Sequence, residues 1–554
     1  MRLSRRRLLK GALCGAFVGA AGCSPGPRPR VGALLGAGRA SLAHRLWAPF
    51  QAQAGVRVER ARVVIVGGGV AGLSAAWRLR RAGFEGEVLL LELDARLGGT
   101  SQSGEGGSGP VALGAHYATI PNKENIHVQA IFADLGLIVG ADSAGRPAYD
   151  PAAICLAPQE RLFIGGEWIL GLWPATGASA EDEAQREAWE AELSVWRSTI
   201  GADGRPAFAL PIALSSEDPA LRALAEPTFA AWLDARGYTS PRLRWMIEYG
   251  CRDDFGATLR STSAWAGLHY HCARRPFVAD PLDMGTQVLT WPGGNGALVD
   301  GLAKRCGATL RVGALVRRVE ADTGRVWVEA GGELIEVQAE RVILAVPSAV
   351  SARLLDRPAP LALTTAPWRV AVLQLDGWTP GPGVPAAWDS VPWDPELSAE
   401  ETDLGAIDNG WQARRYGGPT TLSHYQPLCA DDPSAARQAL LHAGWEEQAE
   451  AVLHRMRKGW PDLPEHLARI DIWAWGHGTV RPSPGLHTDP RRLAALGAIE
   501  GRVHHAHTEL SGMSLFEEAS WHGVRAAEEA LQALGAPVGP SLLGADLGAA
   551  WRRG

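Results

Sequence analysis

The most regular apolar pattern in the chain lies at residues 63–72. Four β-branched residues, Val63–Val66, follow one another without a polar break, as in a strand that is buried on both faces of a parallel sheet. The next residues have the spacing GxGxxG, which lets a dinucleotide pyrophosphate approach the backbone at the start of a helix. The pattern therefore predicts a strand, a tight turn and a helix over about residues 71–82. The positions expected to face the phosphates are Gly67, Gly69, Val70, Ala71 and Gly72.

A second apolar strand is predicted at residues 87–91, and Glu92 follows it directly. A carboxylate at this place accepts hydrogen bonds from both ribose hydroxyls and disfavours a 2′-phosphate. The ligand is therefore expected to be FAD or NAD rather than NADP.

Apolar residues recur with helical spacing in three further stretches, 181–196, 229–236 and 435–456. Each stretch predicts an amphipathic helix. Proline- and glycine-rich loops such as residues 379–385 interrupt the region around them.

The N-terminus has a different pattern, with basic residues followed by a short apolar run and small residues. This order is typical of a signal peptide. Residues 4–10 resemble the twin-arginine export signal, and residues 20–23 resemble a lipobox in which Cys23 would be lipidated. A plain signal cleavage nearby is the alternative. Residues 24–60 are interpreted as a tether, either an ordinary flexible leader or a basic segment suited to an anionic membrane surface.

The formal net charge is -6, and residues 1–22 carry five basic residues and no acid, so the remainder has a charge of -6 - 5 = -11. An acidic body argues against nucleic acid as a partner. The five cysteines after residue 23 have no CxxC spacing, and no disulfide framework or zinc site is expected from them.

Five blocks in the chain resemble the flavin amine oxidase and phytoene desaturase superfamily. They are residues 92–101, 113–117, 291–298, 309–347 and 505–527. The resemblance implies that FAD is the cofactor and that a three-stranded insert returns to the sheet near residue 347. It also implies roles for the second glycine pair, for the segment beneath the flavin, for the backbone beside the adenine and for an acid on the ribitol. In addition to the residues of the first turn, the implied cofactor-binding residues are Glu92, Gly98, Gly99, Thr100, Gly114, Ala115, His116, Val316, Glu509, Gly512, Met513 and Ser514.

The last block is predicted to form a strand, a turn and a helix. Ser514 and Glu517 have the spacing of a capping box at the start of this helix. The helix N-terminus would direct its dipole at the electron-rich edge of the flavin.

The fold class expected from these blocks is α/β. A Rossmann-like FAD-binding domain, a parallel sheet with a three-stranded insert, is joined to a mixed α+β substrate domain. The FAD-binding domain would consist of residues 61–125, 285–350 and 471–540, and the substrate domain of residues 126–284 and 351–470.

The catalytic candidates are less closely matched to the family. An arginine, Arg353, stands where relatives often have a lysine, and it cannot act as a neutral base. His477 lies where some relatives attach FAD covalently, so covalent attachment, a role as pocket wall or proton acceptor, and plain packing stay open. His116 is an acid/base candidate, and Tyr117 lies beside it on the expected substrate side. The histidines at 504, 505 and 507 have no evident third ligand, so no metal site is expected.

The leading hypothesis is an exported FAD-dependent oxidoreductase, periplasmic or held at the membrane through Cys23. It would oxidise a small amine or amino acid by hydride transfer to flavin N5. A desaturase or isomerase of an apolar, membrane-derived molecule is the first alternative, and a non-catalytic flavoprotein is the second.

Overall fold

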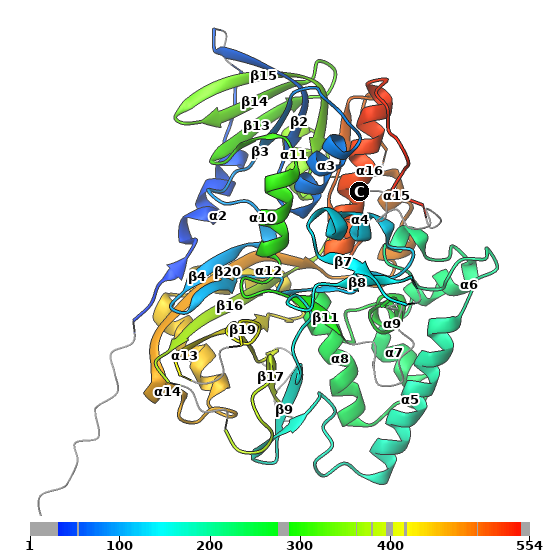
Figure 1. Cartoon of the computed structure of the whole chain (residues 1–554), viewed down its shortest axis with the longest axis vertical. Coiled ribbons are helices and arrows are strands. Elements are labelled where there is room, and N and C mark those ends of the chain that lie inside the picture. The colour runs from blue at the N-terminus through cyan, green and yellow to red at the C-terminus, as the bar shows by residue number, and fades with distance from the viewer. Residues whose placement is uncertain are drawn as a thin grey trace, which may run out of the picture.

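The computed structural model describes residues 31–52, 55–143, 145–274, 287–359, 361, 363–377, 381–394, 403–414, 418–495 and 497–544. The predicted signal peptide and residues 24–30 of the predicted tether lie outside these residues. The described chain is built around one sheet of seven strands and one of eight. Figure 1 shows the two sheets one above the other, with helices packed on each. The expected α/β fold class is confirmed. Among the described residues, no helix has the length and hydropathy needed to cross a bilayer.

The seven-stranded sheet has a parallel centre. Its strand β2 (Arg57–Val66) lies between β3 (Val88–Leu91) and β15 (Glu333–Leu344) and runs parallel to both. The sheet has the order β12-β3-β2-β15-β14-β13, and one further strand, β21, pairs with β15. The remaining strands are β12 (Thr309–Arg311), β13 (Ala314–Glu320), β14 (Arg325–Ala330) and β21 (Val503–His505).

The two halves of strand β15 differ in how many of their faces are buried, and the burial pattern along the strand shows this difference. Along residues 333–339 more and less buried positions alternate, and this half pairs antiparallel with β14. Residues 342–344 are all buried, because this half lies between the parallel strands β2 and β21. Alternation marks a strand with one covered face, and a continuous apolar run marks a strand with two. The predicted three-stranded insert is therefore confirmed.

Two helices cover one face of the parallel strands and pack very closely against each other. They are α3 (Val70–Arg81) and α16 (Phe516–Ala533), close to the predicted helix positions. A Cβ atom added to Gly523 in α16 would lie 2.2 Å from the carbonyl oxygen of Ala71 in α3. The same side of the sheet carries α10 (Gly296–Arg305) and α4 (Ile126–Asp134), and α11 (Ser348–Leu355) follows β15.

The eight-stranded sheet has the order β1-β20-β16-β19-β18-β17-β9-β10. Its longest strand, β20 (Leu467–Val480), pairs antiparallel with β16 (Thr365–Leu375) over nearly its full length. Residues 471–480, which the sequence assigned to the FAD-binding domain, therefore belong to this second sheet. The other strands are β1 (Leu34–Leu35), β9 (Glu160–Ile164), β10 (Glu167–Leu170), β17 (Asp389–Pro392), β18 (Ala406–Asp408) and β19 (Thr420–Pro427).

A layer of helices packs beside and beneath the second sheet. Two of the three predicted amphipathic helices form as α5 (Ala180–Ser198) and α7 (Phe229–Asp234). The third, predicted over 435–456, is divided at Ala443–Gly444 into α12 (Pro433–His442) and α13 (Trp445–Met456), because Ala443 adopts an extended conformation there. The other helices of this layer are α6 (Pro219–Arg222), α8 (Pro241–Phe255), α9 (Ala264–Cys272) and α14 (Leu463–His466), whereas α15 (Pro490–Ala494) lies beside α16 (Figure 1).

Short paired strands and 3-10 turns complete the architecture. Strand β6 (Tyr117–Thr119) pairs with β11 (Val288–Thr290), and it brings residue 117 to the level of the second sheet. The other pairs are β4 (Ser103–Gly106) with β5 (Gly109–Ala112) and β7 (Ile138–Ala141) with β8 (Pro147–Tyr149). The 3-10 turns are η1 (Arg45–Trp47), η2 (Gly99–Ser101), η3 (Ile212–Leu214), η4 (Ala223–Ala225), η5 (Leu486–Thr488) and η6 (Thr508–Leu510).

The segment interpreted as a tether is partly folded, which corrects that interpretation for residues 34–47. It forms β1, the helix α2 (Ala37–His44) and η1. The physical reason is that its leucine residues make contacts with both large sheets. Leu34 and Leu35 form the edge strand β1 by pairing with β20, and Leu46 is buried in the apolar cluster beneath the seven-stranded sheet.

The close contact between α3 and α16 leads to a prediction. Replacement Gly523→Ala should lower the free energy of unfolding by about 1–3 kcal/mol, because the added methyl group must separate the two helices. Gly140→Ala is the matched control, since a Cβ there meets nothing within 4 Å. Denaturant unfolding at one fixed FAD concentration measures both, as the ligand itself shifts stability. Equal stability of the two variants would contradict the tight packing.

Candidate functional site

The glycine turn after β2 leaves a groove at the carboxyl end of the parallel strands. Gly67 has φ 106°, and a Cβ there would lie 2.3 Å from the carbonyl oxygen of Ala345, so only glycine fits. Gly69 and Gly98 form a bridge between the two glycine-rich segments. A Cβ added to Gly69 or to Gly99 would meet only the Cα atom of the other residue, at 4.0 and 3.6 Å. The groove therefore has free space in front of these two glycines.

Two features of this groove fit a dinucleotide. Helix α3 begins at Val70 and has no side-chain cap at its N-terminus, so its first N–H groups are available to phosphate oxygens. Glu92 lies one strand away, where its Oε2 accepts a hydrogen bond from Gly68 N at 2.7 Å and its Oε1 accepts one from Asp94 N at 2.8 Å. These bonds fix the carboxylate, although burial raises its pKa. Val316 is buried in the apolar cluster along the same sheet.

The second glycine pair and the segment beneath it connect the groove to a cavity. Gly98 has φ 116° and Gly99 φ 56°, and η2 carries Thr100. A Cβ on Gly114 would lie 2.1 Å from the carbonyl oxygen of Thr100. Thr100, Gly114 and Ala115 line the cavity. Residues from the glycine turn to residue 115 therefore form one path from Glu92 to this cavity.

We call this space, of about 140 Å³, the carboxylate cavity. Its walls come from β6, from strands β16, β19 and β20 of the eight-stranded sheet, from the end of α8 and from the start of α16. On one side Trp475 donates a hydrogen bond from Nε1 to the carbonyl oxygen of Leu113 at 2.6 Å. On another side the ring of His116 lies 4.5 Å from that of Tyr425 and 5.5 Å from that of Trp388. The lining includes Thr100, Gly114, Ala115, His116, Tyr117, Asp253, Asp254, Arg274, Asn295, Tyr425, Trp475, Ser514 and Glu517.

Two adjacent carboxylates at the end of α8 give the cavity its charge. Tyr117 donates a hydrogen bond from its hydroxyl to Asp253 at 3.0 Å. Arg274 forms an ion pair with Asp254 at 2.7 Å, which leaves Asp253 without an equally close cation among the described contacts. Burial, and then the neighbouring Asp254, raise the pKa of Asp253 to about 7. The sequence did not indicate these acids, because they lie on a helix with no recognisable motif.

Further acids lie behind this wall. Asp389 on β17 and Glu160 on β9 are directly paired in the parallel register of the second sheet. Tyr249 donates a hydrogen bond to Asp389 at 3.2 Å. Burial, followed by the mutual repulsion of these acids, raises the pKa of Asp389 well above its usual value. The side of the cavity near α8 is thus rich in carboxyl groups.

The predicted acid/base residues His116 and Tyr117 both line the cavity. Burial lowers the pKa of His116 to about 4, which favours the neutral ring near pH 7. Burial raises the pKa of Tyr117 well above its usual value. Tyr117 is therefore a neutral hydrogen-bond donor that orients the two carboxylates.

The other two catalytic candidates lie elsewhere. Arg353 does not line the cavity, and its guanidinium donates to the carbonyl oxygens of Leu46 and Ala48 at 3.2 and 3.3 Å. Helix α11 thus directs this side chain at the N-terminal segment. His477 bonds Thr365 at 2.8 Å through Nδ1, and its neighbours Gly478 and Thr479 line the cavity while it does not. Burial lowers the pKa of His477.

The C-terminal block reaches both the groove and the cavity. Glu509 accepts hydrogen bonds from the backbone N and the Oγ of Ser348 at 2.6 and 2.7 Å, and Gly512 turns with φ 77°. The predicted capping box is wrong, because α16 starts at Phe516 without a side-chain cap. Ser514 instead accepts a hydrogen bond from Val480 N, which ties the turn to β20. Met513 is fully buried in the helical core, so only its backbone could serve a cofactor.

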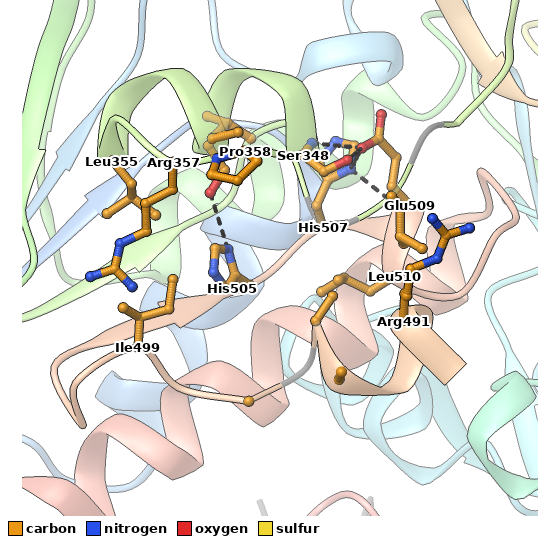
Figure 2. A pocket seen from close by; sticks show the side chains of 17 residues that line it. Ser348, Leu355, Arg357, Pro358, Arg491, Ile499, His505, His507, Glu509 and Leu510 are labelled. Carbon is orange, nitrogen blue, oxygen red and sulfur yellow. Dashed lines mark hydrogen bonds and ion pairs between the residues drawn. The ribbon is translucent and has the colours of Figure 1, made fainter. Parts of the chain in front are cut away.

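A second, more apolar cavity of about 350 Å³ lies beside α11 (Figure 2). Figure 2 shows Ser348, His507 and Glu509 together at one end, and His505 on the neighbouring wall. His505 bonds Ser351, whereas His504 bonds Glu529 on α16. The three histidines therefore have separate partners, and no group of three potential metal ligands occurs in the described residues.

Comparisons with known proteins agree with this geometry. The profile of the family described as flavin containing amine oxidoreductase matches residues 70–531. Coproporphyrinogen III oxidase of Mycobacterium bovis is 30% identical over 347 residues, which cover 59% of this chain and 70% of that protein. A solved double mutant of putrescine oxidase covers 86% of this chain and 100% of its own, with 18% identity and a TM-score of 0.60. A fatty acid isomerase from P. acnes covers 84% and 97%, with 16% identity and a TM-score of 0.59. The last two likenesses show the fold alone.

The space in front of Gly69 gives a prediction that separates cofactor binding from folding. Gly69 has φ -76°, which alanine adopts without strain. Gly69→Ala should leave the unfolding temperature of the cofactor-free protein unchanged. It should weaken FAD binding roughly tenfold or more, about 1.4 kcal/mol, because the methyl group enters the space of the phosphates. Titration of the stripped protein with FAD measures this, and unchanged affinity would contradict the assignment of the groove.

Proposed function

The chain belongs to the flavin-containing amine oxidoreductase family and is an FAD-dependent oxidoreductase, and from this premise we propose that it oxidises a cationic amine. The observation that carries the proposal is the pair of carboxylates, Asp253 and Asp254, on a wall of the carboxylate cavity that also has aromatic faces.

Protein residues would hold FAD along the path already described. The glycine turn and the start of α3 would bind the pyrophosphate, Glu92 the ribose, and the segment at Gly114 and Ala115 the ring. Bound there, FAD supplies a two-electron acceptor for a substrate carbon. The chain's own part is to orient the substrate and to exclude water from the cavity.

The cavity walls suit an alkylammonium group. Arg274 is paired with Asp254, and Asp253 has no equally close cation among the described contacts. A protonated amine would supply a positive charge beside Asp253. The aromatic rings of Tyr425 and Trp388 lie near His116 on the same side, and aromatic faces attract cations. In the free enzyme the pKa of Asp253 is raised to about 7 by burial and by Asp254, and a bound ammonium group would favour its ionised form.

A porphyrinogen is the competing substrate class, since the mycobacterial relative is named a coproporphyrinogen III oxidase. Coproporphyrinogen carries carboxylate side chains. Among the described residues that line the carboxylate cavity, Arg274 is the only arginine or lysine, and it is already paired with Asp254, so the cavity offers these carboxylates no free cation. The charge of the cavity therefore favours the amine.

The proposal includes export. Residues 4–10 resemble the twin-arginine signal, and this route carries proteins that have already folded around their cofactors. Cys23 would then be lipidated and hold the enzyme at the outer side of the membrane. Residues 1–22 carry five basic residues and no acid, as an export signal requires, whereas the remainder of the chain is acidic.

The amine proposal predicts a pH-dependent reduction of the flavin. Mixed without oxygen with a panel of mono- and diamines, the enzyme should lose its flavin absorbance, and kcat/KM should rise with pH through about 7. The sign follows because the free enzyme's carboxylate must be ionised to pair with the ammonium group. The groups that face Asp253 and set this pKa are Asp254, Arg274, Tyr117 and Glu160.

The matching variant is Asp253→Asn. Loss of one charged partner should lower kcat/KM for amines about 10–100-fold at pH 8 and remove the rise through pH 7. The same variant should be more stable than the wild type at pH 8, because the folded protein no longer holds a carboxylate with a raised pKa. Asp300→Asn, an exposed position on α10, is the control. Reduction by coproporphyrinogen and by no amine would refute the proposal.

Export is tested by fractionating cells that produce the full chain. Replacing Arg5 and Arg6 with lysine should retain the protein in the cytoplasm. Cys23→Ser should move it from the membrane fraction to the soluble exported fraction, whereas Cys14→Ser, within the same leader, should not. Export that is insensitive to the arginine pair would rule out the twin-arginine route.

A further inference from the structure

The folded part of the N-terminal segment contacts both sheets beside the cofactor groove. Its first contact is with the eight-stranded sheet, where β1 runs parallel to β20. Ile470 N and Ile472 N donate hydrogen bonds to the carbonyl oxygens of Val31 and Ala33, each at 2.9 Å. The chain then crosses to the other sheet as α2 and η1. Figure 1 shows α2 between β3 and β20.

The far end of this segment is fixed to the seven-stranded sheet. The side chain of Leu46 is 4% exposed and lies in the same apolar cluster as Val316, the residue expected beside the adenine. Arg353 on α11 donates to the carbonyl oxygens of Leu46 and Ala48, and Arg317 on β13 donates to that of Ala48 at 3.1 Å. Two guanidinium groups therefore hold the backbone of η1.

Arg39, on α2, spans the gap between the sheets. Its Nε forms an ion pair with Asp94 at 2.7 Å, just beyond the end of β3. On the opposite side its guanidinium lies 4.9 Å from the ring centroid of Trp473 and 5.0 Å from that of Trp475. Trp475 lines the carboxylate cavity. Arg39 thus joins the ribose end of the groove to the wall of the cavity.

We propose that residues 31–50 form a clasp over the FAD groove and that Arg39 is its latch. FAD, once bound, would leave only after Arg39 separates from Asp94 and from the two tryptophans. This inference rests on the cofactor and not on the identity of the substrate. It makes Arg39 a positioning residue for FAD, outside the glycine turns that recognise the cofactor.

The contacts favour a clasp over a segment that blocks the groove. The ion pair of Arg39 is made with Asp94 and not with Glu92, whose carboxylate is held by two backbone N–H groups of its own. The space in front of Gly69 and Gly99 is also free of side chains within 4 Å of an added Cβ. The segment is attached on both sides of the groove while its phosphate site stays open.

The test measures FAD release from the purified holoenzyme, followed by the fluorescence of the freed flavin after dilution. Arg39→Ala should speed release about tenfold, equal to about 1.4 kcal/mol, and should speed FAD uptake by the stripped protein as well. Arg39→Lys keeps the positive charge and should restore slow release in part. The control is Arg186→Ala on α5, which removes an arginine that pairs within its own helix.

Arg353→Ala is a second, independent variant, because it loosens the clasp at η1 without touching Arg39. It should also speed release relative to Arg186→Ala. The clasp is refuted if release from both variants matches the wild type. It is equally refuted if FAD binds more tightly to Arg39→Ala, since the segment would then compete with the cofactor. Neither result depends on whether the enzyme oxidises amines.

Discussion

The structure depends on how closely the backbone packs around the first glycine turn. Gly67 leaves no room for a side chain against Ala345, and a Cβ on Gly72 would lie 1.9 Å from the carbonyl oxygen of Gly67. Gly523 on α16 likewise has no room for a side chain, here against the carbonyl oxygen of Ala71 on α3. These contacts hold β2, β15, α3 and α16 together and direct the uncapped N-terminus of α3 into the groove. The position of the groove is therefore a consequence of packing that only glycine allows.

In the carboxylate cavity, by contrast, the arrangement lowers the stability of the folded protein, because it buries carboxyl groups close to one another. In the unfolded chain an aspartate ionises near pH 3.9, whereas burial and Asp254 raise the pKa of Asp253 to about 7 in the folded protein. The folded state therefore loses stability as the pH rises between these values. Tyr117 and Tyr249 offset part of this loss by donating hydrogen bonds to Asp253 and Asp389. Such strongly shifted groups in a cavity are typical of functional sites.

The sequence predicted the parts of the fold that obey local rules. The buried run Val63–Val66, the glycine spacing and Glu92 led to the parallel sheet and the groove, because each depends on neighbours in sequence. Asp253 and Asp389 could not be found in this way, since α8 and β17 meet only in the tertiary structure. Ser514 had the spacing of a cap, but tertiary contact with Val480 took its hydroxyl. The sequence puts Arg353 where relatives often have a lysine, whereas the direction of its side chain is set by α11 and by carbonyl groups more than three hundred residues earlier in the chain.

The N-terminal segment folds because of contacts that also lie beside the cofactor groove. Its prolines at 25, 27 and 29 and its lack of acids before Glu59 predict a tether. The signal for its folding lies in its partners and not in its own pattern. Leu34 and Leu35 need the edge of β20, and Leu46 needs the cluster around Val316. These partners belong to different sheets. The segment can therefore make both sets of contacts only when the two sheets are at the correct distance from each other. That distance also sets the width of the groove between Asp94 and Trp475, where Arg39 makes contact with both. Cofactor retention and the relative position of the sheets are thus linked through one guanidinium group.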